Sequence, residues 1–240
     1  MENNRYLEAL ALMGVGGAHP GGLHLTKSRL AAENIDSRMA ILEAGCGTGQ
    51  TAAYIAEQFQ CHVTALDASE TMLEKARERF LAKNLPIELR QGNIENLPYP
   101  HDHFDMVVAE SVIVFTDIAR SIAEFKRVLK PDGVLYAVEM VLENKLPEHE
   151  MKPILDFYGV TRLLTETEWR NLFYHVGFQD VRAEVFTIPS GKTGLDNTPD
   201  FLLSENVDSG WFDVIQEHEE LTTLYEERLD FRIFRCSLDN

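Results

Sequence analysis

The chain has 240 residues, 45% of them hydrophobic, which is enough apolar sequence for one well-buried core. It carries 39 acidic and 22 basic residues, so the formal net charge is −17 and most of the surface would repel a nucleic acid. No apolar run reaches the roughly 20 residues that a membrane-spanning helix needs, so we expect no membrane partner.

The N-terminal part contains a glycine-rich stretch between two short helical segments. One segment runs from Tyr6 to Met13, and the other starts near Thr26. The stretch between them, residues 14–24, is open to two interpretations. It is either a flexible connector or a mobile cover over a ligand site, and a cover would bring His19 or His24 in as a base.

Apolar runs of strand length alternate with helical periodicity through the middle of the chain, which is typical of parallel βαβ units. Two further runs in the last third complete a predicted seven-stranded sheet, so the sequence predicts an α/β fold. The predicted strands are Met39 to Ala44, Cys61 to Asp67, Ile87 to Gln91, Phe104 to Glu110, Val134 to Met140, Val181 to Phe186 and Phe231 to Cys236.

Capping residues mark several helices between these strands. Ser69 is a candidate N-cap, and Thr165 with Glu168 has the spacing of a capping box before a helix that ends at Gly177. Another helix, over residues 118–129, is expected to stop at the Lys-Pro-Asp-Gly sequence that follows it. Residues 188–210 are rich in turn-forming residues and predict a long loop.

The most informative stretch is residues 41–50, where a buried strand leads into a glycine turn that opens a helix. Gly45, Gly47 and Gly49 allow a sharp bend and a close approach by a ligand, and the helix offers unpaired N–H groups. A dinucleotide turn would need glycine where Gln50 stands. A nicotinamide cofactor is therefore the weaker interpretation.

With Glu43 before it, this turn resembles the first motif of class I S-adenosylmethionine-dependent methyltransferases, which reads E/D-x-G-x-G-x-G. An apolar run ending in Asp67 follows 18 residues after Gly49, and Gly92-Asn93-Ile94 follows a third strand. Residues 97–100 and 127–133 also look like segments of this family, in the expected order.

The resemblance implies a Rossmann-like sheet that is mostly parallel with the last strand antiparallel, helices on both faces, and S-adenosylmethionine as cofactor. It implies that Asp67 accepts hydrogen bonds from the ribose hydroxyls and that Met72 and Ile94 sandwich the adenine. Asn93 stands where the family usually has aspartate, but its amide oxygen can still accept a bond. The implied cofactor-binding residues are Glu43, Gly45, Cys46, Gly47, Gly49, Asp67, Ala68, Met72, Gly92, Asn93, Ile94 and Glu110.

Several of these residues have an alternative structural role that the sequence leaves open. Asp67 could cap the next helix, Asn93 could form an ordinary turn, and Met72 could be a core residue. Glu110 could be an exposed residue at a strand end, and Cys46 a small residue tolerated in the turn.

The resulting prediction is an enzyme that transfers a methyl group directly from S-adenosylmethionine to a small-molecule acceptor. A sulfonium donor is already activated, so orientation and exclusion of water supply most of the catalysis. Candidate catalytic residues are His19, His24 and Glu110, with Tyr158 a weaker one. The histidines show no metal-ligand spacing, so no metal is expected. Alternatives are a module that binds the donor without transfer and, less favoured, a nicotinamide-dependent oxidoreductase.

We expect one methyltransferase domain over residues 1–240. Within it, residues 1–37 form a helical cover, residues 38–141 bind the cofactor, and residues 142–240 form the acceptor side and complete the sheet. Three cysteines without paired spacing, and a start without a basic signal region, predict a cytoplasmic protein. The fold does not select among carbon, nitrogen, oxygen and sulfur acceptors, and no motif specifies an oligomeric state.

Overall fold

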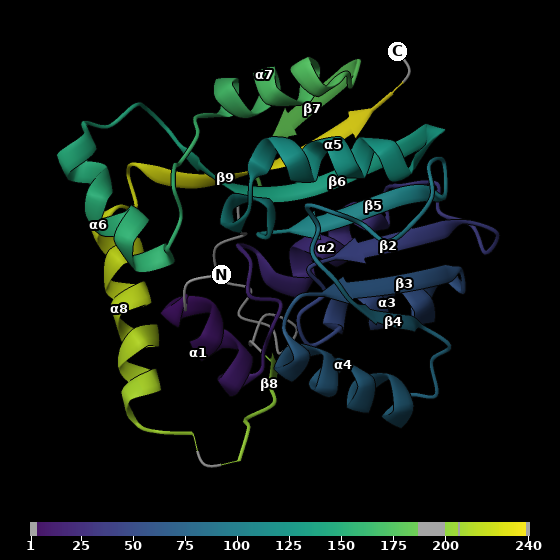
Figure 1. Cartoon of the computed structure of the whole chain (residues 1–240), viewed down its shortest axis with the longest axis horizontal. Coiled ribbons are helices and arrows are strands. Elements are labelled where there is room, and N and C mark those ends of the chain that lie inside the picture. The colour runs from purple at the N-terminus through teal and green to yellow at the C-terminus, as the bar shows by residue number, and fades with distance from the viewer. Residues whose placement is uncertain (1–3, 187–199, 206, 239–240) are drawn as a thin grey trace.

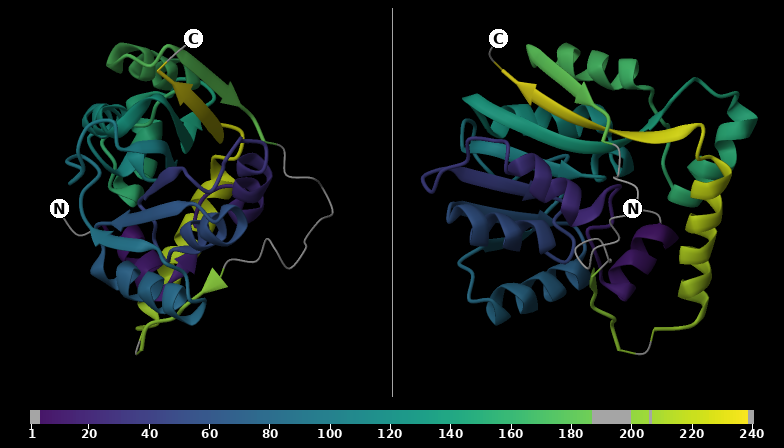
Figure 2. Two further views of the ribbon diagram at one scale, coloured as in Figure 1. Left: turned by 90° about the vertical axis from the view of Figure 1, so that its right-hand side faces the viewer. Right: turned by 180° about the vertical axis from the view of Figure 1, so that it is seen from behind.

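A seven-stranded sheet forms the centre of the computed structural model, which describes residues 4–186, 200–205 and 207–238. The strand order is β4-β3-β2-β5-β6-β9-β7, and helices pack on both faces (Figures 1 and 2). Strands β2 to β6 are parallel, whereas β9 runs antiparallel to its neighbours β6 and β7. The strands are β2 (Ala40–Ala44), β3 (His62–Asp67), β4 (Glu88–Gln91), β5 (Phe104–Glu110), β6 (Leu129–Leu142), β7 (Asp180–Glu184) and β9 (Leu229–Ser237). The predicted fold class is confirmed, including the antiparallel last strand.

The helices begin and end at recognisable caps. The Ser69 hydroxyl accepts the Met72 N–H at 3.3 Å, and Thr165 and Glu168 form a complete capping box. Gly177 ends its helix in the left-handed conformation. The helices are α1 (Arg5–Met13), α2 (Gly22–Leu30), α3 (Gln50–Phe59), α4 (Glu70–Ala82), α5 (Ile118–Val128), α6 (Glu148–Tyr158), α7 (Glu166–Val176) and α8 (Gly210–Leu224), with a short 3₁₀ helix η1 (Ile113–Phe115).

The core has a cluster on each face of the sheet and a third beyond its edge. On one face α5 and α7 bury Phe125 and Trp169; on the other, α2, α3 and α4 bury apolar residues such as Leu25 and Ile55. The third cluster joins α1, α6, η1 and the start of α4 next to the carboxyl end of β6. These elements therefore cap the edge at which the parallel strands end.

Several boundaries differ from the predictions. α2 begins at Gly22 rather than near Thr26, because Gly21 adopts a left-handed conformation as its N-cap and α2 then buries Leu25 and Leu30 on the sheet. α5 ends at Val128, because the backbone turns extended at Leu129 and joins β6. Helices α6 and α8 were not predicted.

The segments before α2 and before α8 pair with each other. β1 (Val15–Gly16) lies antiparallel to β8 (Asp200–Phe201), and the Leu202 N–H donates to the Gly14 carbonyl at 3.0 Å (Figure 1). The expected loop over 188–210 lies partly outside the described residues. Its described end instead forms β8 and, from Gly210, the start of α8.

Side chains from α4 hold this β1–β8 ribbon. Arg79 donates to the Asp200 carboxylate at 2.6 Å and to the Thr48 carbonyl at 2.8 Å. Lys75 donates to the Ser204 hydroxyl at 2.9 Å and also to the Leu202 carbonyl. The ribbon is therefore fixed next to the glycine turn.

None of the described helices is long and apolar enough to cross a bilayer.

Candidate active site

The predicted cofactor residues gather at one edge of the sheet. Glu43, Asp67 and Glu110 stand at or near the carboxyl ends of β2, β3 and β5, and Gly92 follows β4. Strands β2 and β3, and likewise β2 and β5, are hydrogen-bonded neighbours, so these ends are adjacent. Open α/β sheets bind their ligands at this edge.

The glycine turn is held by the strand beside it. The N–H groups of Gly45 and Cys46 both donate to the Leu66 carbonyl, at 2.8 and 2.9 Å. Gly45, Gly47 and Gly49 all have positive φ, the region that favours glycine. The turn therefore needs glycine for its backbone shape at all three positions.

The three glycines differ in what surrounds them. A Cβ on Gly45 would lie 2.4 Å from a Val112 methyl carbon, and one on Gly49 would lie 2.5 Å from the Phe80 ring. A Cβ on Gly47 would meet nothing closer than the Met72 sulfur, at 4.0 Å. Gly45 and Gly49 therefore serve the packing of the protein itself. Gly47 borders open space in which a ligand can approach the backbone.

Asp67 connects this turn to α4. Its Oδ2 accepts the Gly47 N–H and its Oδ1 accepts the Ser69 N–H, each at 2.8 Å. Each carboxylate oxygen can accept about two bonds, so both retain capacity for a sugar hydroxyl. Burial raises the pKa of Asp67, and the backbone N–H groups act in the opposite direction. The Ala68 carbonyl is engaged by the Gln91 side chain at 3.2 Å.

The predicted adenine residues have clear structural duties. Asn93 is exposed, and its side-chain oxygen accepts the Glu95 N–H at 2.9 Å, as in an ordinary turn. A Cβ on Gly92 would lie 2.8 Å from Leu66, so this glycine allows close packing. Ile94 belongs to the core cluster under the sheet, and Met72 to the cluster that caps it. The adenine sandwich stays a prediction.

Glu43 and Cys46 are buried at the base of the turn. The Glu43 Oε2 atom has no hydrogen-bond partner among the described residues. Burial, and after it the nearby Glu110, raise the pKa of Glu43 and favour its neutral form. Burial likewise raises the pKa of the Cys46 thiol, which disfavours a reactive thiolate and supports the role of a small residue.

Glu110 is the centre of a polar cluster that sequence reasoning found only in part. Its Oε1 accepts the Thr26 hydroxyl at 2.6 Å and its Oε2 accepts the Thr51 hydroxyl at 2.8 Å. The His19 Nε2 atom lies 3.4 Å from Glu110 Oε2. The His19 and Glu110 side chains are only 4% and 7% exposed, so Glu110 is not a solvated strand end.

The other two predicted candidates lie apart from this cluster. The His24 ring faces Phe186, with centroids 6.2 Å apart. The Tyr158 hydroxyl is 2.9 Å from His218 Nδ1, within the cluster that caps the sheet. The structure therefore brings together His19 and Glu110, but neither His24 nor Tyr158 with them.

A buried carboxyl that the sequence analysis missed supports the segment after β5. The Glu139 side chain accepts the backbone N–H groups of Val112, Ile113 and Val114, at 3.1, 2.8 and 3.3 Å. Burial raises the pKa of Glu139 to about 8. A glutamate inside the apolar run of β6 is the sequence signal that could have identified it.

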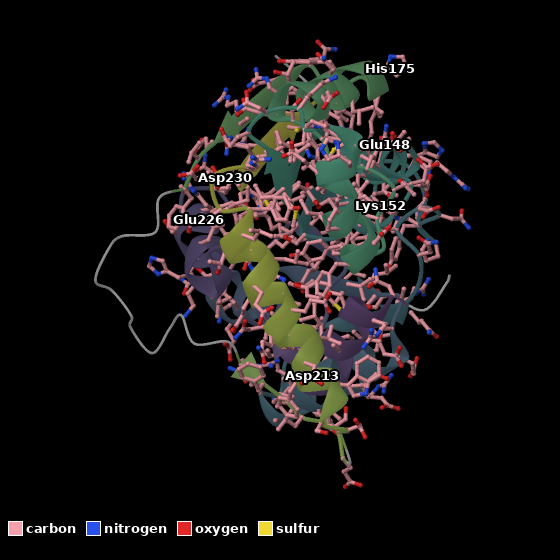
Figure 3. The ribbon with its side chains drawn as sticks, turned by 90° about the vertical axis from the view of Figure 1, so that its left-hand side faces the viewer. Glu148, Lys152, His175, Asp213, Glu226 and Asp230 are labelled. Carbon is pink, nitrogen blue, oxygen red and sulfur yellow. The ribbon has the colours of Figure 1, made fainter. Side chains whose placement is uncertain are left out.

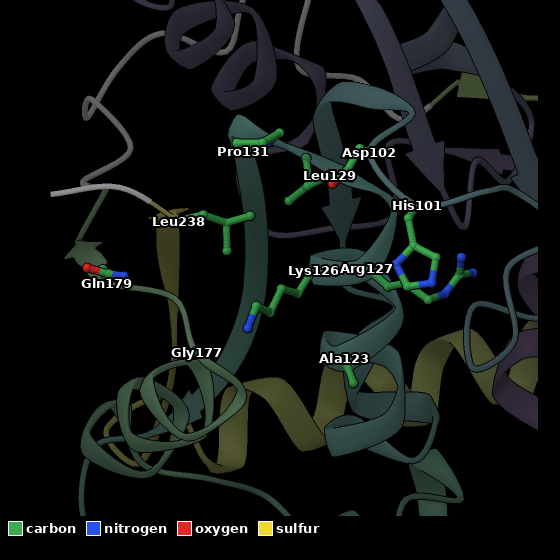
Figure 4. Close-up of a pocket in the computed structure, with 10 residues that line it drawn as sticks. All are labelled: His101, Asp102, Ala123, Lys126, Arg127, Leu129, Pro131, Gly177, Gln179 and Leu238. Carbon is green, nitrogen blue, oxygen red and sulfur yellow. The ribbon is translucent and has the colours of Figure 1, made fainter.

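A separate cleft of about 550 Å³ lies at the opposite edge of the sheet, beside the amino ends of β5 and β6 (Figure 4). Lys126 and Arg127, two adjacent basic residues in the last turn of α5, line it. Lys126 donates to the Val176 carbonyl, and Arg127 binds the Glu124 carboxylate. Both cations thus have structural partners.

Within the described residues no group of three or more His, Cys, Asp or Glu side chains could hold a metal ion.

Comparisons with known proteins agree with this geometry. Residues 41–133 match a family described as a methyltransferase domain. An uncharacterised methyltransferase of Bacillus subtilis, YodH, is 40% identical over 231 residues, or 96% of this chain and 98% of that protein. A glycine/sarcosine/dimethylglycine N-methyltransferase of Actinopolyspora halophila is 32% identical over 66% of this chain and 29% of that protein.

Solved structures show the same fold. Phosphoethanolamine N-methyltransferase 2 of Haemonchus contortus, in complex with phosphomonomethylethanolamine and S-adenosylhomocysteine, has a TM-score of 0.77 at 17% identity, covering 98% of this chain and 57% of that one. A putative sarcosine dimethylglycine methyltransferase of Galdieria sulphuraria has a TM-score of 0.74 at 16% identity, covering 90% of this chain and 84% of that one. The chain is therefore a class I S-adenosylmethionine-dependent methyltransferase.

Proposed function

We propose that this enzyme methylates a small molecule, with the donor held across the carboxyl ends of β2 to β5. The observation that carries the donor site is the open space beside Gly47, in a turn whose other two glycines are packed against protein atoms. Relatives named for small acceptors, such as sarcosine and phosphoethanolamine, support the acceptor class. The net charge of −17 argues against a nucleic acid.

Each proposed role follows from a position in the site. Asp67 binds the ribose hydroxyls through its remaining lone pairs, and Met72, which faces Gly47, contacts the nucleoside. Glu110 and His19 lie near the reacting end of the donor. S-adenosylmethionine supplies an activated methyl group, and the chain orients it and excludes water.

The proposed cover is residues 1–37, together with the β8 segment that pairs with it. Its α1 side chains pack in the cluster beyond the strand ends, and Thr26 of α2 contacts Glu110. The free thiols of Cys46, Cys61 and Cys236 suit a reducing, cytosolic setting.

Two measurements test this function. Calorimetry should show binding of S-adenosylmethionine and S-adenosylhomocysteine but not of NAD, and incubation of the enzyme and donor with metabolite pools should yield a product one methyl group heavier. Donor binding without formation of S-adenosylhomocysteine would instead indicate a regulatory module. Tight NAD binding with no response to either sulfur ligand would refute the donor assignment.

A further inference from the structure

We propose that Glu110 is the carboxylate that receives the ammonium group of the donor, and that protonated His19 occupies Glu110 when the donor is absent. This inference rests on the proposed donor site. In this proposal Glu110 selects for the amino-acid end of the donor, and His19 competes with the donor for Glu110 in a pH-dependent way.

The first observation is that Glu110 is a buried carboxylate without a permanent cation. Two threonine hydroxyls fix its oxygens, from α2 on one side and α3 on the other. Among the ion pairs of the described part of the chain, its cationic partner is His19, at 3.4 Å. A carboxylate that is 7% exposed is costly unless a charge or hydrogen bonds compensate it.

The two hydrogen-bond contacts of the His19 ring require a proton on each ring nitrogen. Thr26 uses its hydroxyl proton on Glu110, so it can only accept from His19 Nε2, 3.4 Å away. Nε2 must therefore carry a proton. The other ring nitrogen, Nδ1, lies 3.2 Å from the Pro20 carbonyl, which is also an acceptor. Both contacts are hydrogen bonds only when the ring is an imidazolium.

The titratable groups around Glu110 offer it no other cation. Glu43 from β2 faces it, and burial favours the neutral form of that residue. Tyr136 from β6 is a further titratable neighbour; burial raises the pKa of its hydroxyl, which therefore stays neutral. Arg79 from α4 acts on Glu43, and its guanidinium is engaged by Asp200.

A donor ammonium matches this arrangement because it carries a full positive charge and three N–H donors. It can replace the imidazolium at Glu110 without protonating the carboxylate. Donor binding should therefore displace the protonated His19 side chain from Glu110. Low pH should favour the contact of His19 with Glu110 over binding of the donor.

Calorimetry of S-adenosylhomocysteine tests the competition, because this ligand has the same ammonium and needs no turnover. In the unchanged protein, affinity for S-adenosylhomocysteine should fall roughly tenfold between about pH 8 and pH 5.5. His19→Gln cannot titrate and should lose most of this dependence. The matched control is His175→Gln, an exposed position in the last turn of α7 (Figure 3), and this variant should behave as the unchanged protein.

Glu110→Gln tests the receptor role. At about pH 8 it should weaken S-adenosylhomocysteine at least tenfold, while His19→Gln at that pH should not. Equal pH dependence in the unchanged protein and in His19→Gln would overturn the competition, and this comparison holds even if Glu110→Gln fails to fold. Unchanged affinity in a folded Glu110→Gln would overturn the receptor role. If the unchanged protein binds neither sulfur ligand at any pH, the donor site itself fails, and this inference with it.

Discussion

Two glycines in one turn have different reasons to be glycine. Gly45 leaves no room for a side chain because Val112 packs against it, whereas Gly47 faces open space. The spacing of the two glycines predicts both as turn residues but does not separate their roles, because the difference depends on Val112 and Met72, far away in the chain.

This contrast gives the first prediction. Gly45→Ala should lower the free energy of unfolding strongly, since its Cβ would lie 2.4 Å from Val112. Gly47→Ala should lower the free energy of unfolding by only about 1 kcal/mol, through backbone strain. It should nevertheless reduce the affinity for the donor by more than tenfold. Chemical denaturation and calorimetry on both variants separate the two effects. Equal loss of donor affinity and stability in the two variants would contradict it.

Asp67 has two duties that one substitution can separate. Asp67→Asn keeps an oxygen for one backbone N–H but loses the charge that strengthens bonds to the ribose hydroxyls, about 1.5–3 kcal/mol for a charged bond. We expect a tenfold to hundredfold rise in the donor dissociation constant, measured by calorimetry. A thermal melt serves as the control that the variant is folded. If the folded variant binds the donor with unchanged affinity, Asp67 only shapes the turn.

At the scale of elements, Glu139 links β6 to η1 and thereby positions the segment that follows Glu110. Its pKa is raised to about 8 from the ordinary 4.5. The folded protein thus retains a proton that the unfolded chain has lost, and over this interval the free energy of unfolding falls as pH rises.

The predicted fall in the free energy of unfolding is at most about 1.4 kcal/mol per pH unit. Glu139→Gln, neutral at every pH, should lack this decline. Its amide oxygen can still accept the Val112 and Ile113 N–H groups, whereas its NH2 group cannot accept the Val114 N–H, so its stability should be lower at every pH. Denaturant titrations at several values between about pH 5 and pH 9 measure it. Parallel stability profiles for the two proteins would show that Glu139 does not titrate in this range.

The β1–β8 ribbon gives an element-scale prediction about the cover. Asp200→Ala removes the partner that ties the ribbon to Arg79 of α4. We expect faster proteolysis of the N-terminal segment and slower turnover, with little change in melting temperature because the pair is partly exposed. Asp156→Ala, which removes an exposed pair with Lys152 on α6, is the control. Equal proteolysis of both variants would mean that the ribbon does not restrain the cover.

The elements differ in how far the sequence predicts them. Strands β2, β3 and β5 were predictable because each is a mostly apolar run with an acidic residue at or near its end. β4 carries a weaker signal, since Leu89 is its one apolar residue. Helix α8 was not, since among its residues only Val214 is fully buried and its apolar pattern is weak. β1 and β8 have two residues each, far apart in the chain, so neither carries a local signal. The partners of Glu110, Thr26 and Thr51, likewise come from distant segments.

For the whole molecule, the acidic surface gives a prediction about partners. Acidic residues such as Glu148, Asp213 and Glu226 are displayed around α6 and α8 (Figure 3). Transfer RNA at low salt should therefore neither bind in a mobility-shift assay nor change the affinity for S-adenosylhomocysteine. A salt-dependent shift would reveal a basic surface that the net charge conceals.

The position of β9 also sets an order on folding during synthesis. β9 is the last strand in the chain, yet it lies between β6 and β7. In the sheet β7 pairs with β9 alone, so until residues 229–237 have left the ribosome neither edge of β7 is paired, and β6 also has one edge unpaired. An unpaired strand edge can capture another chain. The interval between the synthesis of residue 184 and that of residue 237 is therefore when the nascent protein is most exposed to aggregation, and when a chaperone would help it most.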